Sequence, residues 1–192
     1  DPRLAEAGAG VEEQEAVRTT VRRFVDKEIS PYIREWDASG HFEPKLLRRM
    51  AELQFMGVCI PARYGGAGMD FVCYVLSMIE ISKACASCGV IMSVCNSLYN
   101  FPVYAYGTEE QKQKYLRPVA SGEALGCYGL TEAGAGSDPA KMNTTAVLDG
   151  DEWVINGSKI FITNASTRIT GGVTVLARTG ERGGGKKELS CI

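Results

Sequence analysis

A glycine-rich loop that ends in a hydroxyl and a carboxylate is the stretch of this sequence best suited to ligand chemistry. It follows a β-type run and reads Thr131-Glu-Ala-Gly-Ala-Gly-Ser-Asp138. Two glycines within three residues let the backbone approach a ligand closely and supply N–H donors, and Ser137 adds a hydroxyl. Such a loop suits a pyrophosphate. It lacks the spacing and βαβ setting of a Rossmann site, and a surface turn is the alternative interpretation.

A second candidate lies about thirty residues further along the chain. Lys159-Ile-Phe-Ile-Thr-Asn164 places an aromatic ring and a hydroxyl two positions apart. On a strand, Phe161 and Thr163 would face the same side. An aromatic ring beside a hydrogen-bond donor can hold a flat heteroaromatic ring and bond its edge nitrogen, whereas Phe161 alone is also compatible with core packing. This second element strengthens the ligand interpretation of the glycine loop.

The composition is that of an ordinary globular protein and argues against several functional classes. Of the 192 residues, 45% are apolar and 23% charged, and the net charge is −2. A nucleic-acid surface would need a concentrated basic face, and no apolar run reaches the ~18 residues of a membrane span. The first residues carry no secretory signal, although a targeting segment removed beforehand is compatible with the sequence. We expect neither a nucleic-acid nor a membrane partner.

Cysteine and histidine usage points away from metal chemistry. The seven cysteines are an odd number and lie mostly in apolar runs, so we expect buried free thiols in a reducing compartment. Cys85 and Cys88 have redox or zinc-like spacing, but no second such pair accompanies them. His41 is the only histidine, which leaves too few ligands for structural zinc and only one candidate for a catalytic triad. The sequence predicts no metal site.

The chain reads as helices up to about residue 120. Helix signals and apolar periodicity predict helices over 12–29, 43–57, 70–82, 89–106 and 108–118. Asp70 is the expected cap of the third helix, and Thr108 with Gln111 the expected capping box of the fifth, which Pro118 closes. The glycine-rich segment 61–68 is interpreted as a tight connection rather than a phosphate cradle, because no P-loop Lys-Ser/Thr follows.

The helix predicted over 89–106 is nearly all apolar, which indicates burial on all sides. Its polar residues Asn96, Ser97 and Asn100 either form hydrogen bonds within the core or line a cavity. Core pairing is the more common fate of such groups, because an unpartnered buried amide costs about 1–3 kcal/mol.

Strand signals replace helix signals from Leu125 onward. A hairpin is predicted over 144–155, followed by strands at 159–163 and 173–177, a mobile basic loop at 178–187 and the start of a further strand at 189–192. We expect an α+β protein with an N-terminal all-α helical domain, residues 1–120. A truncated middle β-domain, residues 121–192, would follow as an incomplete antiparallel, barrel-like sheet with an exposed edge.

Two motifs together are similar to the acyl-CoA dehydrogenase family. They are Tyr-x-Leu-Thr-Glu-x-Gly-x-Gly-Ser-Asp at 128–138 and Gly-Asp-x-Trp-Val-Ile-Asn-Gly-x-Lys-x-Phe-Ile-Thr-Asn at 150–164. The leading helices, the Pro-x-x-Tyr-Gly-Gly-x-Gly loop and Asn96-Ser97-Leu98 also match, so the resemblance covers essentially the whole chain. Asn-Ser-Leu-Tyr and Lys-Ile-Phe-Ile-Thr most resemble the short-chain, butyryl-CoA branch, particularly its bacterial members.

The resemblance implies FAD as the cofactor. Thr131 would bond the flavin edge, Phe161 would pack on the isoalloxazine in place of a more usual tryptophan, and Thr163 would reach the N5 region. Gly136 and Ser137 would contact the pyrophosphate. The full cofactor-binding set would be Tyr128, Leu130, Thr131, Gly136, Ser137, Phe161, Ile162 and Thr163.

The resemblance also implies an acyl-CoA substrate that is oxidised to the trans-2-enoyl product. Ser137 would contact the acyl-CoA, and the acyl chain would run near Val94, Cys95 and Tyr99, with the bulky Tyr99 favouring short acyl groups. Electrons would leave through an electron-transfer flavoprotein. The full-length family forms homotetramers, and the expected compartment is the bacterial cytoplasm, with the mitochondrial matrix as the alternative.

Family members are about twice as long as this chain. Their second half carries a helical bundle with the glutamate base, so we expect no catalytic base in this chain, which would be a fragment, a split subunit or a truncated product. Glu80, Glu132 and Glu152 are not expected to substitute, because Glu132 lies inside the cofactor loop and the others read as helix-face and hairpin residues. The alternatives are an acyl-CoA oxidase-type flavoprotein and a non-catalytic subunit or fragment.

Overall fold

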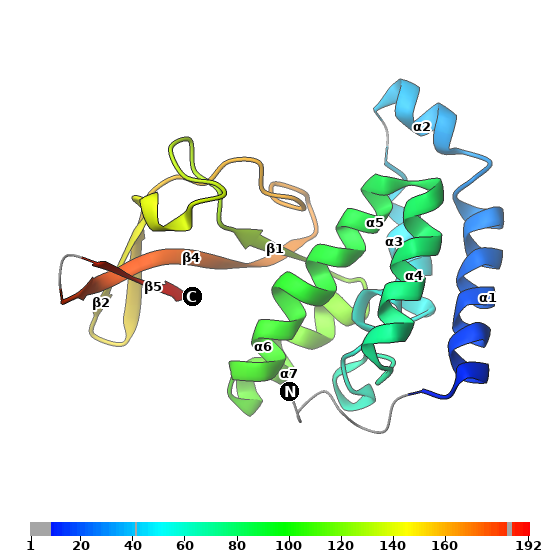
Figure 1. Cartoon of the computed structure of the whole chain (residues 1–192), viewed down its shortest axis with the longest axis horizontal. Coiled ribbons are helices and arrows are strands. Elements are labelled where there is room, and N and C mark those ends of the chain that lie inside the picture. The colour runs from blue at the N-terminus through cyan, green and yellow to red at the C-terminus, as the bar shows by residue number, and fades with distance from the viewer. Residues whose placement is uncertain (1–8, 41, 184–185) are drawn as a thin grey trace.

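The computed structural model describes residues 9–40, 42–183 and 186–192. Helices make up the chain as far as Ala120, and the named strands begin at Leu125, so a helical part is followed by a sheet (Figure 1). The predicted α+β class is confirmed. His41, the only histidine of the sequence, lies outside the described residues.

Seven α-helices are assigned among the described residues: α1 Val11–Glu28, α2 Ile33–Ser39, α3 Pro44–Glu52, α4 Phe71–Ala84, α5 Ala86–Ser93, α6 Phe101–Tyr106 and α7 Glu109–Ala120. The predicted caps are confirmed: Asp70 accepts the Cys73 amide at 2.9 Å, and Thr108 and Gln111 form a reciprocal capping box. The sequence reasoning missed α2. It was wrong to end α7 at Pro118, which lies inside the helix. No described helix has both the length and the apolar character needed to cross a membrane.

Helices α1 and α4 are joined by charge as well as by apolar packing. Glu80 on α4 is only 5% exposed, and its carboxylate lies 3.0 Å from both Arg18 and Arg22 of α1 and 3.1 Å from Lys83. Hydrogen bonding from Arg22 is the largest influence, and it lowers the pKa of Glu80 to about 2 against the opposing effect of burial. Glu80 is therefore a structural anchor on the buried side of its helix.

The glycine-rich segment 61–68 is a tight connection, as expected. Its amides bond back to the preceding chain: Ala67 donates to the Gly57 carbonyl at 3.0 Å and Gly68 to the Ile60 carbonyl at 2.9 Å. A side chain at Gly66 would overlap the carbonyl oxygens of Ile60 and Gly57. Because its donors are used internally, this segment does not offer a phosphate cradle.

The long apolar helix is not buried on all sides, so that prediction is wrong. The segment α5, a π-helical turn η3 (Val94–Asn100) and α6 follow one another without a break. Val90 is 46% exposed, Leu98 38% and Tyr106 76%. The helix thus packs one side against the core and leaves an apolar strip open, and single π turns of this kind often occur at functional sites.

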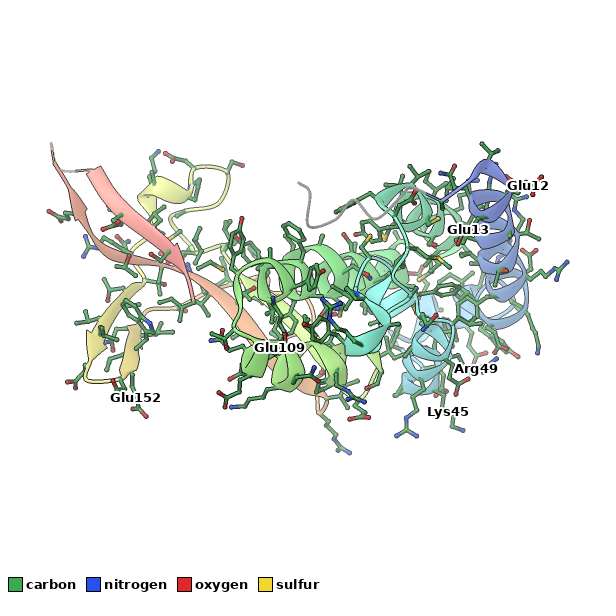
Figure 2. All side chains as sticks on the ribbon, turned by 90° about the horizontal axis from the view of Figure 1, so that it is seen from below. Glu12, Glu13, Lys45, Arg49, Glu109 and Glu152 are labelled. Carbon is green, nitrogen blue, oxygen red and sulfur yellow. The ribbon has the colours of Figure 1, made fainter. Side chains whose placement is uncertain are left out.

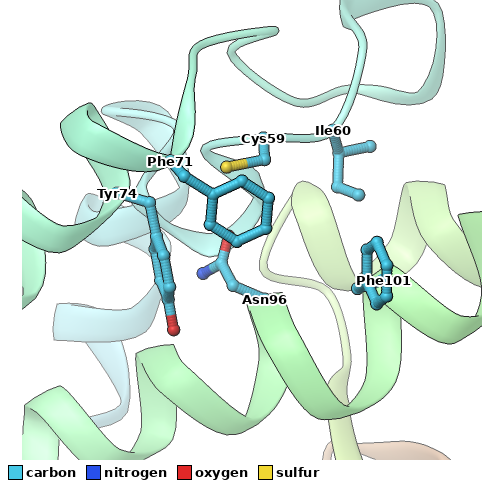
Figure 3. Close-up of a pocket in the computed structure, with 6 residues that line it drawn as sticks. All are labelled: Cys59, Ile60, Phe71, Tyr74, Asn96 and Phe101. Carbon is cyan, nitrogen blue, oxygen red and sulfur yellow. The ribbon is translucent and has the colours of Figure 1, made fainter. Parts of the chain in front are cut away.

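Asn96 and Asn100 of this helix form hydrogen bonds within the core, although only the amide nitrogen of Asn100 is bonded, to the Met56 carbonyl at 3.0 Å, and its Oδ1 has no partner among the described residues. Asn96 accepts the Val58 amide at 2.8 Å and donates to the Phe55 and Met92 carbonyls at 2.9 Å. Figure 3 shows Asn96 beside Cys59 and Phe71 in a cavity of only about 10 Å³. A cavity of this size holds one water molecule at most, so core pairing and not ligand binding explains Asn96.

The five strands of the described residues form one sheet with the order β1-β4-β2-β3, and β5 also pairs with β4. Their bounds are β1 Leu125–Gly129, β2 Thr145–Asp149, β3 Glu152–Asn156, β4 Thr170–Arg182 and β5 Lys186–Cys191. The predicted β2–β3 hairpin is confirmed, and its strands are antiparallel. Strands β4 and β5 also pair antiparallel, but β1 and β2 both run parallel to β4. The sheet is therefore mixed, and the prediction of a fully antiparallel sheet is corrected.

Two predicted segments differ from the observed structure. Residues 159–163 are not a strand: they run irregularly, and Phe161 has a left-handed backbone with φ of 57°. Most of the predicted mobile loop at 178–187 instead lies in strands, since β4 continues to Arg182 and β5 begins at Lys186, while its residues 184–185 lie outside the described residues. Five of the seven thiols are buried as expected, but Cys59 is half-buried and Cys191 is exposed.

Candidate functional site

Strand β1 places the start of the glycine loop where the helical part of the chain meets the sheet. Gly126 of β1 pairs with Gly172 of β4, and the Tyr99 ring from η3 lies directly over this glycine pair. Thr174 on β4 donates to the Leu98 carbonyl at 2.9 Å and the Cys127 carbonyl at 3.2 Å. The absence of side chains at Gly126 and Gly172 lets helix and sheet meet here, which fixes where the loop after β1 begins.

The structure brings the two candidate segments of the sequence together. The Ile160 amide donates to the Thr131 carbonyl at 2.8 Å, and the Lys159 ammonium donates to the Leu130 carbonyl at 2.9 Å. Residues 130–131 and 159–160 are thus side by side although almost thirty positions separate them. A ligand that contacts Thr131 is therefore within reach of the segment that carries Phe161 and Thr163.

A buried ion pair between Glu132 and Lys159 holds the two segments. The carboxylate is 8% exposed, lies 2.9 Å from the Lys159 nitrogen, and accepts the backbone amides of Asn143 at 2.7 Å and Thr144 at 2.9 Å. Burial raises the pKa of Glu132, but hydrogen bonding from Thr144, Asn143 and Lys159 outweighs it and lowers the pKa to about 2. Glu132 is therefore a charged structural group and a weak proton acceptor.

Beyond Glu132 the loop turns sharply and presents its backbone outward. The amides and carbonyls of Glu132 and Ala135 bond to each other at 2.8 and 3.2 Å. Within the described chain, the amides of Gly136 and Ser137 find no acceptor, and both residues are exposed. The Asp138 carboxylate accepts the backbone amide of Ala140, two residues further on, at 3.2 Å. Gly136 and Ser137 thus offer two adjacent free donors, which suits an anion.

The apolar ring of Phe161 is exposed to solvent. It is 89% exposed, whereas Ile162 and Thr163, which follow it directly, are half-buried. Asn164 anchors the end of the segment, because its amide donates to the Gly126 carbonyl at 3.0 Å and its own carbonyl accepts the Thr170 hydroxyl at 2.7 Å. The segment is therefore tied at Lys159 and Asn164, and it holds the ring out between these two anchors.

The remaining predicted residues lie deeper. Tyr128 and Leu130 are half-buried, and burial raises the pKa of the Tyr128 phenol. Val94, Cys95 and Tyr99 all belong to η3 and are buried, at 7%, 0% and 4% exposure. Burial raises the pKa of Cys95 and of Tyr99 to about 12, so both are neutral. The Tyr99 ring faces the sheet glycines Gly126 and Gly172.

Two family models match nearly the whole chain. The model described as acyl-CoA dehydrogenase, N-terminal domain, matches residues 11–123, and that described as acyl-CoA dehydrogenase, middle domain, matches residues 127–192. The chain belongs to the acyl-CoA dehydrogenase family. The probable acyl-CoA dehydrogenase YngJ of Bacillus subtilis is 46% identical, and the short-chain specific acyl-CoA dehydrogenase of Clostridium acetobutylicum 45% identical, each over 180 residues. These matches cover 94% of this chain but 47% of each relative, so the chain spans about half their length.

Solved structures agree with the family assignment. The butyryl-CoA dehydrogenase of Megasphaera elsdenii has a TM-score of 0.84 at 30% identity, over 97% of this chain and 49% of its own. A glutaryl-CoA dehydrogenase of Mycobacterium smegmatis in complex with FADH2 has a TM-score of 0.82 at 35% identity, over 99% and 47%. A chain from a study of the electron transferring flavoprotein of Acidaminococcus fermentans has a TM-score of 0.85 at 37% identity, over 98% and 49%.

Glu80, Glu132 and Glu152, which are not expected to serve as the catalytic base, lie in three separate places in the structure. Glu80 is locked among Arg18, Arg22 and Lys83, and Glu132 is held charged by Lys159. Figure 2 shows Glu152 at the far end of the β2–β3 hairpin, pointing away from the helices. None of the three therefore combines an available proton-accepting group with a place beside Phe161. Among the described residues, no group of three Cys, His, Asp or Glu side chains could hold a metal ion.

Sequence reasoning missed the roles of Lys159 and Asn164. Both were recognised only as parts of a motif, yet they are the anchors of the segment around Phe161. The available signal was their polarity at the two ends of an otherwise apolar run. The distant partners, Glu132 and the Gly126 carbonyl, could not be read from local pattern.

Proposed function

We propose that this chain forms the helical and β-sheet walls of the FAD site in a short-chain acyl-CoA dehydrogenase. The observation that carries the proposal is the bare Phe161 ring beside a loop whose Gly136 and Ser137 amides lack acceptors. A flat apolar surface next to free amide donors suits a ligand that joins an aromatic ring system to a pyrophosphate. The FADH2-bound neighbour and the short-chain specific relatives support this choice of ligand.

Each flavin contact is assigned to a residue at this joint. Thr131 bonds the ring edge, Phe161 packs on the isoalloxazine, and Thr163 bonds the N5 region. The backbone around Tyr128, Leu130 and Ile162 borders the ring, and Gly136 and Ser137 bind the pyrophosphate. In this proposal the Glu132–Lys159 pair acts by keeping the two flavin-contacting segments adjacent.

The acyl-CoA lies against the same wall in this proposal. Ser137 contacts the thioester ligand as well as FAD, and the acyl chain runs along η3 near Val94 and Cys95. Tyr99 fills the space over Gly126 and Gly172, which leaves less depth for a long chain. A preference for short acyl groups follows, and activity on a long-chain but not a C4 thioester would contradict it.

When bound, FAD accepts the hydride from the substrate β-carbon. The glutamate that takes the α-proton belongs, in this proposal, to the half of the relatives that this chain does not span. Glu132 does not replace it, because a carboxylate with a pKa of about 2 is a weak base. The whole protein would be a homotetramer that passes electrons to an electron-transfer flavoprotein in the bacterial cytoplasm, a compartment favoured by the bacterial relatives.

Flavin binding by the purified chain tests the proposal. FAD added to the chain should show quenched flavin emission, and Phe161→Ala should weaken binding at least about fivefold because base-like rings stack on aromatics for about 1–3 kcal/mol. Tyr32→Ala, which removes another exposed aromatic, at the N-cap of the distant α2, is the matched control and should leave the affinity unchanged. Equal effects of the two substitutions would contradict the assigned site.

A second measurement addresses the missing base. The FAD-loaded chain is mixed with butyryl-CoA without oxygen, and the flavin absorbance is followed. The proposal expects no bleaching by this chain alone. Bleaching would contradict the assignment of the base to another part of the polypeptide.

A further inference from the structure

A pair of cysteines, Cys85 and Cys88, lies where α4 ends and α5 begins. Cys85 is both the C-cap of α4 and the N-cap of α5. Its amide donates to the Ile81 carbonyl at 2.9 Å, and its carbonyl accepts the Gly89 amide at 3.1 Å. Both backbone groups of Cys85 are therefore bonded, and this junction fixes where its side chain starts.

The side chain of Cys85 folds back over the first turn of α5 toward Cys88. The backbone of Cys85 is extended, with φ of −145° and ψ of 104°, as is usual for an N-cap residue. Its Sγ accepts the backbone amide of Cys88 at 3.4 Å. Burial, and after it a hydrogen bond to the Cys85 sulfur, raises the pKa of the Cys88 thiol. The two sulfurs thus face each other within one helical turn.

Helix capping alone does not account for both thiols. Sulfur is a weak acceptor, and Ser, Asp or Asn is preferred at an N-cap, so a hydroxyl at this position would cap α5 better. Capping also makes no use of the Cys88 side chain, which is buried in the apolar core. Among the described residues no group of three possible ligands could hold a metal ion. Two facing thiols in a Cys-x-x-Cys turn are instead suited to forming a disulfide.

The turn between the two cysteines lies at the surface. Ala86 and Ser87 are exposed, Cys85 is 7% exposed, and Cys88 is 0% exposed. A small reagent that approaches the turn from solvent therefore meets the Cys85 sulfur first. The Cys88 sulfur lies behind it and is placed to react with whatever forms on Cys85.

We propose that Cys85 and Cys88 are a redox modification site, at which a hydroperoxide oxidises the dithiol to a disulfide. Both are free thiols in the structure, which is the reduced form of the pair. The bond closes within the first turn of α5, where the sulfurs already face each other, so no rearrangement of the backbone is needed. The proposal does not depend on flavin binding.

The chemistry is a two-electron oxidation in two steps. The Cys85 thiolate attacks one oxygen of hydrogen peroxide, the O–O bond breaks, and Cys85 sulfenic acid and hydroxide form. The Cys88 sulfur then displaces the hydroxyl group, which leaves as water with the Cys88 proton while the S–S bond forms. The hydroxide takes up the proton that Cys85 released, so two thiols and one peroxide give one disulfide and two waters. A small thiol reverses the reaction by exchange and is itself oxidised to its disulfide.

Peroxide treatment of the folded chain tests the proposal. Cys191→Ser is the starting chain, because it removes the exposed thiol that could join two copies. Hydrogen peroxide should remove two hydrogens from the peptide that carries Cys85 and Cys88, and fragmentation should place the bond between them. Alkylation after unfolding should label two fewer thiols, and dithiothreitol should restore both. Because both native cysteines are kept, the result does not depend on whether a variant of the pair folds.

Two single substitutions assign the roles of the sulfurs. Cys88→Ser leaves Cys85 without its partner, so no disulfide should form and dimedone should trap the Cys85 sulfenic acid. Cys59→Ser is the matched control: it removes the half-buried thiol outside the pair and should leave the Cys85–Cys88 product unchanged. Oxidation of Cys59 while Cys85 and Cys88 both stay free would overturn the proposal. A disulfide that joins either of them to Cys95 would overturn it as well.

Discussion

The Lys159 ammonium lies 2.9 Å from the Glu132 carboxylate, and the two side chains are 11% and 8% exposed. Lys159 also donates to the Leu130 carbonyl, and Glu132 also receives two backbone amides. This pair therefore joins both candidate flavin segments and the chain leading into β2. A buried pair with all these hydrogen bonds is costly to break on one side only.

Lys159→Met should lower the free energy of unfolding by about 3 kcal/mol, because it leaves the Glu132 carboxylate buried without its cation. Adding Glu132→Gln should recover part of this loss, since the uncompensated charge is then gone. Urea unfolding of the single and double variants measures both effects. Purely additive losses would show that the two side chains do not interact in the folded chain.

The stability of the folded chain should fall in acid for a defined reason. The pKa of Glu80 and of Glu132 is about 2 in the folded chain, against an ordinary value of 4.5. The folded-state values are depressed, so the stability from these groups is present above pH 4.5 and is lost as pH falls toward 2. Urea unfolding between pH 6 and 3 should show the decline, and Glu132→Gln should make it shallower. An identical slope in the variant would contradict the depressed pKa.

Glu80→Gln should weaken the contact between α1 and α4. The variant keeps the shape of the side chain but loses the charge that faces Arg18, Arg22 and Lys83. Hydrogen bonds to charged groups contribute about 1.5–3 kcal/mol, and the partly exposed arginines favour the lower end. Glu110→Gln on the outward face of α7 is the control and should change stability by less than about 0.5 kcal/mol.

Sequence signals predicted the parts of this fold that depend on neighbouring residues. The Asp70 cap, the Thr108 capping box and the β2–β3 hairpin all follow from local chemistry, and all are present. The segment around Phe161 could not be predicted in this way. Its β-branched pattern suggests a strand, but Lys159 and Asn164 are held by partners 27 and 38 residues away, and these bonds keep it irregular.

The same limit applies to the sheet and to the long helix. Four glycines at 178–187 suggested a loop, yet pairing of β4 with β5 orders most of that segment. The parallel direction of β1 and β4 depends on how the chain between them is routed, which no local signal encodes. The family resemblance assigned Tyr99 to the acyl-chain region, but its packing over the distant pair Gly126 and Gly172 could not be predicted from local pattern.

Gly172→Ala should destabilise the chain because the added methyl group would overlap the Tyr99 ring. Overpacking of this kind costs about 1–3 kcal/mol. Tyr99→Leu in the same chain should restore part of the loss by removing the ring. Gly134→Ala is the matched control in the candidate loop, where an added methyl group meets no atom within 4 Å. Equal losses in the two glycine variants would mean that Tyr99 does not constrain Gly172.

Phe161→Gly should separate a ligand-binding role from a structural one. Phe161 has a left-handed backbone, which strains a bulky residue and is free of strain for glycine, and its ring is 89% exposed. The variant should therefore unfold at the same urea concentration as the parent or a higher one, since relief of strain offsets the entropy that glycine adds to the unfolded chain. Its affinity for FAD should nevertheless fall at least about fivefold, to the level of Phe161→Ala. A clear loss of stability would instead assign Phe161 to packing within the chain, and retained FAD affinity would remove it from the flavin site.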